Sequence, residues 1–110
     1  MSYAKCYSAN VYTPYADVYQ TETGYVFEFA LPGVEKDAVT VGLESGGLVV
    51  SGERKAPRND YLRRENPSGK FRRKFSLPSD ADTQSVDAKL ENGVLSVVVG
   101  RVPAVQVAVK

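Results

Sequence analysis

The strongest constraint on the fold is a repeated pattern of short segments in which apolar and polar residues alternate. The segment YVFEFAL (25–31) places its three aromatic rings on one side of an extended chain, because successive side chains of a strand point to opposite faces. In AKLENGVLSVVV (88–99), Asn92-Gly93 separates two such segments. This dipeptide tolerates the positive φ of a two-residue type I′ turn. The pattern therefore predicts β-hairpins.

Similar segments recur along the chain, and none has a helical period. We expect strands at 16–20, 25–31, 39–43, 48–54, 70–77, 85–91 and 94–99. A chain of 110 residues is long enough for one domain with one core. Short strands at this spacing predict an antiparallel β-sandwich. The irregular connection 55–68 is long for so small a domain, and such connections usually have a function.

Two features of the composition limit the chemistry. The chain has no histidine and only one cysteine, Cys6. Histidine-dependent catalysis and zinc sites are therefore excluded, and we expect no enzyme, no catalytic residue, no cofactor and no metal. A single cysteine forms no internal disulfide, which favours a cytoplasmic location. The sequence also lacks a long apolar run and an apolar N-terminal core, so we expect neither a membrane span nor a secretory signal.

Charge is distributed unevenly along the chain. Residues 54–74 contain nine basic and two acidic residues, a net charge of +7, whereas the remainder nets −6. A basic segment of this kind can bind nucleic acid or contact an acidic partner subunit. By their spacing, Phe71 and Phe75 fall on the face of the strand that points to the core, whereas Lys70, Arg72 and Lys74 fall on the opposite face. This arrangement favours the partner subunit and argues against nucleic acid.

Four short stretches carry a family resemblance. They are LPGV (31–34), GLVVSGER (47–54), GKFRRKFSLP (69–78) and AKLENGVL (88–95). The third matches the pattern G-x-F-x-R-x-F-x-L-P, and the fourth matches A-x-x-x-N-G-V-L. Together, in this order, they resemble the α-crystallin domain of small heat shock proteins. The retained long loop is typical of the bacterial, archaeal and plant branch.

The resemblance implies an all-β, immunoglobulin-like antiparallel sandwich at residues 15–100. A flexible arm would precede it at 1–14, and a C-terminal tail would follow at 101–110. The implied function is that of an ATP-independent chaperone, or holdase, which binds partly unfolded proteins under stress and passes them to ATP-driven chaperones. It would act as a homodimer or a larger homo-oligomer. The alternatives are a nucleic-acid-binding β-domain that uses segment 54–74 and a CS-type co-chaperone sandwich.

The resemblance also assigns dimerisation to loop 55–68, through a short strand exchanged with the partner subunit. The expected interface residues are Tyr61, Leu62, Arg63, Glu65 and Arg73. Independently, Arg73 has the parity of the apolar face, where a charge needs a partner. We expect Glu65 of the opposite subunit to pair with it. Where the family usually has arginine after this acid, the chain has Asn66.

The tail resembles the family's V-x-V anchor. We expect Val105 and Val107 to dock, with Val107 and Val109 as the alternative register. The groove would be lined by Val39, Val41, Leu43, Val86, Ala88 and Leu90. Only residues 100–104 precede the anchor, a reach of about 18 Å. Docking on the same subunit and docking on another subunit both stay open.

The N-terminal arm is expected to contact clients through Tyr3, Tyr7 and Tyr12. Relatives usually carry a longer arm rich in phenylalanine, whereas this arm has no phenylalanine. We therefore expect a small or unusual assembly.

Overall fold

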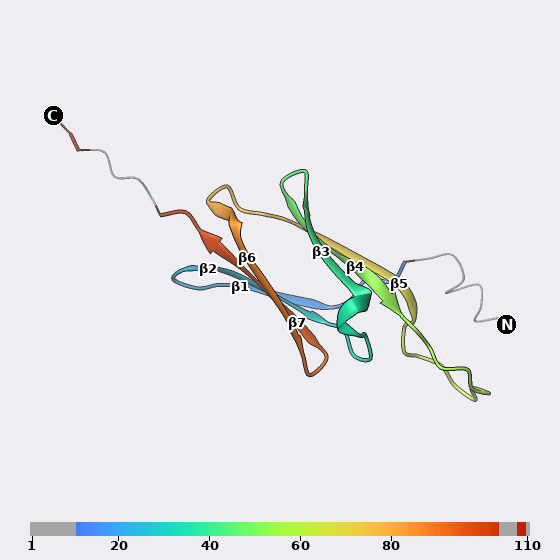
Figure 1. Ribbon diagram of the computed structural model, residues 1–110. Helices are drawn as coiled ribbons and strands as arrows, with labels where there is room; N and C mark the ends of the chain where they lie inside the picture. Colours follow the sequence, from blue (N-terminus) through green and yellow to red (C-terminus); the bar gives the residue numbers. More distant parts are fainter. Residues whose placement is uncertain (1–10, 104–107, 110) are drawn as a thin grey trace.

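Two antiparallel sheets packed face to face make up the domain in the computed structural model, which describes residues 11–103 and 108–109 (Figure 1). One sheet has the order β1-β2-β7-β6 and the other the order β3-β4-β5. The strands are β1 Ala16–Gln20, β2 Gly24–Ala30, β3 Val39–Glu44, β4 Gly47–Arg54, β5 Gly69–Ser76, β6 Ala81–Glu91 and β7 Val94–Arg101. The predicted all-β sandwich is confirmed.

The core lies between the sheets and is centred on aromatic rings. Phe27 and Phe29 from β2 and Phe71 from β5 are fully buried. Phe75 lies across from the first two, with ring centroids 5.7 and 6.0 Å away. Leucines and valines of β4 and β7 fill the rest of this layer. The expected inward parity of 25–31 and 70–77 is therefore confirmed, and it closes the sandwich through burial of apolar area.

Two hairpins close with two-residue turns. Asn92 has φ 55° and Gly93 has φ 76°, as a type I′ turn requires. The β3–β4 hairpin uses the same geometry, with φ 48° at Ser45 and φ 74° at Gly46. A serine with positive φ is uncommon, because its Cβ crowds the backbone there.

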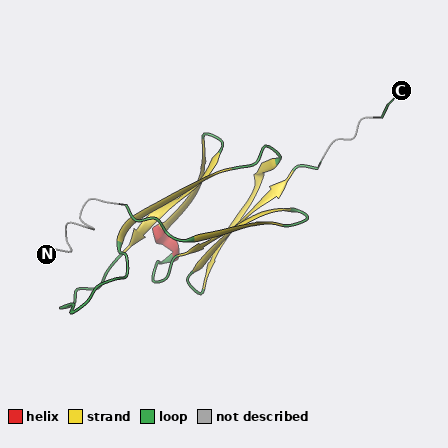
Figure 2. Cartoon of the chain, turned by 180° about the vertical axis from the view of Figure 1, so that it is seen from behind, coloured by secondary structure: helices red, strands yellow, loops and turns green. Residues whose placement is uncertain are grey.

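The start of β6 differs from the sequence expectation. The strand begins at Ala81 rather than at residue 85, because Ala81 and Asp82 pair with the end of β7 through a register shift that ends at Val86. A bulge of this kind interrupts the period of two and so is hidden from a pattern search. The connection before β3 also contains a short 3₁₀ turn, η1 Lys36–Ala38, the red element in Figure 2.

Three of the four family-like stretches meet at one end of the sandwich. The Leu31 N–H donates to the Gly93 carbonyl at 2.8 Å. Arg54 donates from Nε to the Pro32 carbonyl at 3.0 Å and from a terminal nitrogen to the Pro67 carbonyl at 2.8 Å. Arg54 thus links the turn after β2 to the end of the long loop. No role was assigned to it from the sequence.

Replacing Gly93 with alanine should destabilise the fold because of its left-handed backbone. We expect Gly93→Ala to lower the free energy of unfolding by about 1–2 kcal/mol. The matched control is Gly42→Ala on β3, where an added Cβ meets no atom within 4 Å and φ is not positive. That variant should leave stability unchanged or raise it by up to about 1 kcal/mol. Urea unfolding at one protein concentration checks both, and equal midpoints would contradict the role given to the turn.

Candidate assembly surfaces

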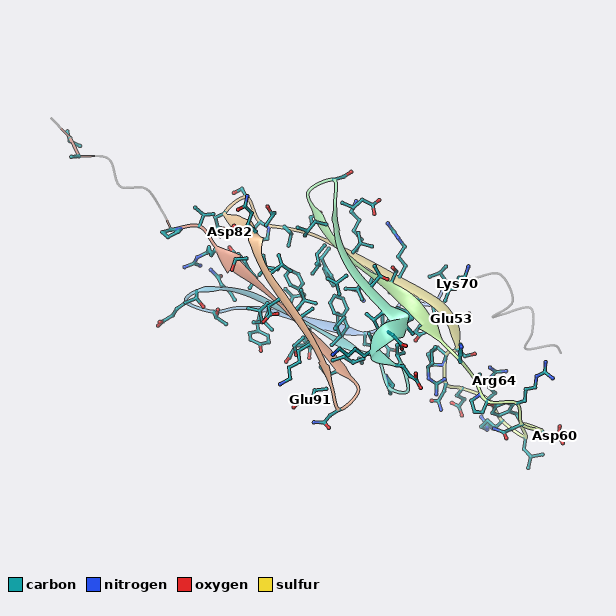
Figure 3. All side chains as sticks on the ribbon, viewed as in Figure 1. Glu53, Asp60, Arg64, Lys70, Asp82 and Glu91 are labelled. Carbon is teal, nitrogen blue, oxygen red and sulfur yellow. The ribbon has the colours of Figure 1, made fainter. Side chains whose placement is uncertain are left out.

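Loop 55–68 projects away from the sandwich beyond the ends of β4 and β5 (Figure 1). Figure 3 shows Asp60 and Arg64 on this projection, well away from the strands. The loop contains neither strand nor helix within one chain. Leu62 is fully exposed, and Tyr61 is partly exposed. A projecting apolar side chain is unfavourable in water, so this loop is a candidate contact surface.

Contacts inside the loop fix its conformation. The guanidinium of Arg64 lies 4.8 Å from the ring centroid of Tyr61. The same guanidinium donates to the buried Ser68 hydroxyl at 2.6 Å. The Tyr61 hydroxyl donates to the Pro57 carbonyl at 2.8 Å. These contacts leave Leu62 pointing outward without support from the sandwich.

Arg73 has the inward parity that the sequence predicted, and it is half-buried. It donates to the Pro14 carbonyl at 3.0 Å, and its guanidinium lies 4.7 Å from the Phe75 ring centroid. Glu65 instead contacts Arg63 at 3.4 Å, and both side chains are largely exposed. Within residues 11–103, no carboxylate forms an ion pair with Arg73. Arg73 and Glu65 of the same chain therefore do not form an ion pair with each other.

A cavity of about 580 Å³ lies between the segment before β1 and the end of the loop. Its walls include Tyr12, Tyr15, Pro32, Arg54 and Glu65. The lining combines tyrosine and proline rings with the charged groups of Arg54 and Glu65 and the polar side chains of Thr13 and Asn66. Glu65 therefore lines a hollow that extends to Tyr15, the residue before β1.

The predicted groove residues lie on edge strands, β3 in one sheet and β6 in the other. Their Cα partners on the neighbouring strands are buried core residues, with one exception at Gly52. Four of the six are half-buried against the core, namely Val39, Val41, Val86 and Leu90. The other two, Leu43 and Ala88, are exposed. Each edge thus presents a row of apolar side chains at alternate positions.

Tyr12 lies against the edge of β5. It forms a parallel bridge to Phe71, and their ring centroids are 5.5 Å apart. Its N–H donates to the Lys70 carbonyl at 3.0 Å, and its carbonyl accepts from the Arg72 N–H at 3.2 Å. Burial raises the pKa of the Tyr12 phenol, although the positive charge of Arg54 acts to lower it. The edge of β5 is therefore partly covered by the chain's own N-terminal segment.

Four of the sequence-predicted site residues cannot be placed. Tyr3 and Tyr7 of the arm and Val105 and Val107 of the anchor lie outside the described residues. Val109, from the alternative register, is described and fully exposed.

A polar cluster holds the end of β7. The Tyr25 hydroxyl donates to Asp80 Oδ1 at 2.6 Å, and Arg101 Nε lies 3.7 Å from Asp80 Oδ2. Arg101 also donates to the Glu22 carbonyl at 3.3 Å. The hydrogen bond to Asp80 raises the pKa of the Tyr25 phenol, with burial and the carboxylate charge adding to the shift. Sequence reasoning missed this cluster, because its members are far apart in the chain and match no motif.

The basic face of β5 does not expose aromatic rings. Lys70, Arg72 and Lys74 are exposed, whereas Phe71 is buried. Arg72 lies 3.8 Å from Glu44. Proteins that bind single-stranded nucleic acid stack its bases against exposed aromatic rings. This face of β5 lacks such rings.

The described part of the chain contains no cluster of three or more histidine, cysteine or acidic residues that could hold a metal ion. No helix within it is both long and apolar enough to cross a membrane.

Comparison with known proteins places this geometry in a family. The family model described as Hsp20/alpha crystallin family matches residues 17–110. The 16.9 kDa class I heat shock protein 1 of Triticum aestivum is 52% identical over 85 residues, which are 73% of this chain and 56% of that protein. The 17.9 kDa class II heat shock protein of Glycine max is 39% identical over 107 residues, which are 93% of this chain and 67% of that protein. The chain therefore spans little more than half the length of the wheat relative.

A solved structure agrees. A small heat-shock protein from Xylella fastidiosa superposes with a TM-score of 0.82 at 28% identity, covering 92% of this chain and 96% of that chain. The sandwich, the signature stretches and the matched family model all agree, and the chain belongs to the Hsp20/alpha crystallin family of small heat shock proteins.

Proposed function

We propose that this protein is an ATP-independent holdase, which binds partly unfolded proteins under stress and prevents their aggregation. The observation that carries the proposal is the presence of apolar rows on the open edges β3 and β6, in a chain of the small heat shock protein family. An open edge offers unpaired backbone groups, and the neighbouring row accepts side chains i and i+2 of an extended segment. Binding of this kind needs no catalytic residue.

Mass action explains how such binding protects a client. Non-native chains expose apolar surface and unpaired strands, through which they associate with one another. A protein that occupies these segments lowers the concentration available for aggregation. The held client can then pass to an ATP-driven chaperone. The single cysteine favours the cytoplasm as the compartment.

The functional unit in this proposal is a strand-exchanged dimer. The segment Tyr61–Arg63 would add to β1 of the partner, because β1 has β2 on one side and no strand on its other side among residues 11–103. Val18 and Tyr19 of β1 are partly exposed, which suits contact with Leu62. Glu65 would then reach Arg73 of the opposite subunit and neutralise a half-buried charge.

Larger assembly would use the V-x-V anchor, with Val105 and Val107 entering the groove between β3 and β6. Loop 55–68 and the C-terminal end of β7 lie at opposite ends of the sandwich (Figure 1). The dimer contact and the tail contact therefore do not compete for the same surface. The solved Xylella fastidiosa relative is described as having a distinct high order structure.

Client contact would also involve the N-terminal tyrosines, since phenol rings make broad, partly polar contacts. Tyr12 is committed to β5, so Tyr3 and Tyr7 are the proposed client-binding residues of the arm.

Aggregation of a thermally unfolding model enzyme should be suppressed without ATP. We expect light scattering to fall as the protein is added, with near-complete suppression at a few subunits per client. An equal mass of a compact protein without open strand edges serves as the control. Light scattering equal to that of the control at every ratio of protein to client would contradict the holdase proposal.

Leu62→Asp should weaken the dimer, because a carboxylate would replace an apolar side chain buried there. Loss of one buried leucine contact, about 1.5–3 kcal/mol, corresponds to a dimer Kd raised by about 10-fold to 100-fold. Sedimentation velocity over a dilution series measures this change. The matched control is Val98→Asp, a partly exposed residue on the outer face of the four-stranded sheet.

The same dilution series tests the proposed Glu65–Arg73 pair. Arg73→Ala should also raise the dimer Kd. A dimer Kd that Arg73→Ala leaves unchanged would contradict the assignment of Arg73 to the interface. Equal effects of Leu62→Asp and Val98→Asp on the dimer Kd would contradict the assignment of loop 55–68 to the interface.

Removing residues 104–110 should reduce the particle mass, because the V-x-V anchor is lost while the dimer loop remains. Multi-angle light scattering at one concentration compares the truncated and full chains. Val105→Asp with Val107→Asp should act as the truncation does, whereas Val109→Asp should not. A particle mass lowered by Val109→Asp but not by Val105→Asp alone would select the Val107 and Val109 register, and an unchanged mass in all variants contradicts the anchor.

A further inference from the structure

Strands β1 and β2 place two carboxylates side by side on the outer face of the four-stranded sheet. Asp17 of β1 and Glu28 of β2 are Cα partners in the antiparallel ladder. Phe27 and Phe29, on either side of Glu28, point into the core, so Glu28 and its partner Asp17 lie on the outer face. Like charges directly opposite each other on a sheet are destabilising. One chain alone therefore bears an electrostatic cost at this point.

The sheet itself supplies no cation to offset this cost. Within residues 11–103, neither Asp17 nor Glu28 forms an ion pair. The four strands present one basic residue on the same face, Lys89 of β6. Strand β7 separates it from Glu28, because Ser96 is the Cα partner of both residues. Lys89 instead holds Glu91 at 2.8 Å. The cation that would balance the two carboxylates therefore has to come from elsewhere.

Aromatic rings and a small hollow surround the two carboxylates. Tyr15 and Tyr19, two residues before and after Asp17, are 86% and 47% exposed. A cavity of about 240 Å³ has Tyr15, Asp17, Glu28 and Val94 among its lining residues. A guanidinium pairs with carboxylates through directed hydrogen bonds and also stacks on aromatic rings. The hollow and its lining therefore suit an arginine side chain.

Loop 55–68 carries an exposed arginine whose present partner is easily given up. Arg63 Nη1 lies 3.4 Å from Glu65, and the two side chains are 79% and 73% exposed. An ion pair this exposed contributes little to stability. The neighbouring Arg64 is engaged within the loop by an aromatic ring and a hydroxyl group. Arg63 is therefore the arginine beside Leu62 that can change partners at little cost.

We propose that Asp17 and Glu28 form the acceptor for Arg63 of a second copy of the chain. This inference rests on the proposed strand-exchanged dimer and adds two residues, Asp17 and Glu28, to its interface. Dimer formation then replaces the Arg63–Glu65 pair within each loop by pairs between subunits. Arg63 takes the two carboxylates of the other subunit, and Glu65 becomes free for Arg73 there.

Alternation along a strand fixes the face on which Arg63 arrives. Leu62 is fully exposed in one chain, and the inward side of the β1 edge offers Val18, which is 47% exposed and is the Cα partner of Phe27. Adjacent residues of a strand point to opposite faces, in parallel and antiparallel pairs alike. When Leu62 covers Val18, Arg63 lies on the outer face with Asp17. The arginine comes from a second copy, because the chain's own loop projects away from the strands (Figure 3).

The acceptor also selects the register of the exchanged strand. A slip of one residue would turn Leu62 to solvent. A slip of two residues would keep Leu62 inward but would move Arg63 about 7 Å along β1, away from Asp17. The apolar contact thus sets the face, and the carboxylates set the position along the strand. Charges that are satisfied in one register exclude the wrong pairings.

A double-mutant cycle on the dimer Kd tests the pairing. The acceptor variant is Asp17→Asn with Glu28→Gln, and it is combined with Arg63→Gln. Sedimentation velocity over a dilution series should show a dimer Kd raised by about threefold to fivefold in the acceptor variant and in Arg63→Gln. The variant with all three changes should have no higher Kd, because the same interaction is already lost. Arg63→Lys should keep most of the affinity, since it keeps the charge.

The matched control removes the same charge from the same face at the opposite edge of the sheet. Asp87→Asn with Glu91→Gln alters two exposed carboxylates of β6. Their Cα partners Val98 and Val94 pair in turn with β2 residues of the outer face. This variant should leave the dimer Kd unchanged, alone and together with Arg63→Gln. A control that raises the Kd as much as the acceptor variant would overturn the inference.

A second readout separates a contact between subunits from a role in folding. In the Leu62→Asp background, which is expected to weaken the dimer, the acceptor variant should leave the urea midpoint unchanged or raise it, because a like-charge pair is removed. A lower midpoint would show that the two carboxylates stabilise their own chain, which contradicts the proposal.

The outcomes distinguish the two levels of the proposal. If Leu62→Asp and Val98→Asp affect the dimer Kd equally, the strand-exchanged dimer itself fails. If Leu62→Asp raises the Kd but the acceptor variant and Arg63→Gln add independently, the dimer stands and the acceptor is overturned. If the acceptor variant leaves the Kd unchanged and instead reduces suppression of client aggregation, the carboxylates bind a basic client segment, and the assignment to Arg63 is overturned.

Discussion

Two open sheets packed face to face leave four strand edges, and every proposed interaction of this protein follows from how those edges are satisfied. Backbone N–H and C=O groups at an edge need partners, and an uncovered edge pairs with other chains. Tyr12 covers part of the β5 edge with two backbone hydrogen bonds. The edges of β1, β3 and β6 have no strand beside them in residues 11–103. A binding protein can be built from such edges without a catalytic site.

The positions of the loop and the tail separate two kinds of assembly. Loop 55–68 leaves at the end where Arg54 links Pro32 to Pro67, and β7 ends where Arg101 lies 3.7 Å from Asp80. In both places an arginine donates to backbone carbonyls of segments distant in sequence. Each arginine thus ties together separate backbone segments at the base of an extension. The proposed dimer loop and the proposed anchor therefore leave the sandwich at opposite ends (Figure 1).

Local sequence features were sufficient to predict the strands and turns. Alternation reports which face a side chain occupies, and Asn92-Gly93 favours one turn type whatever surrounds it. The same features cannot identify contact partners across the fold. Tyr25 and Asp80 are 55 residues apart, and Arg54 contacts Pro32 at a separation of 22. The bulge at the start of β6 was missed for a related reason, because it breaks the period on which the prediction depends.

Arg73 shows how a correct inference from sequence can remain incomplete. Its parity predicted a half-buried charge that needs a partner, and one chain supplies the Pro14 carbonyl and the face of Phe75. These groups satisfy one N–H and attract the cation, but neither carries a negative charge. A carboxylate is the stronger partner for a guanidinium. If Glu65 of a second subunit takes that place, the same side chain contacts the segment before β1 and the partner's loop. Dimer formation would then also restrain the point where the N-terminal arm joins the domain.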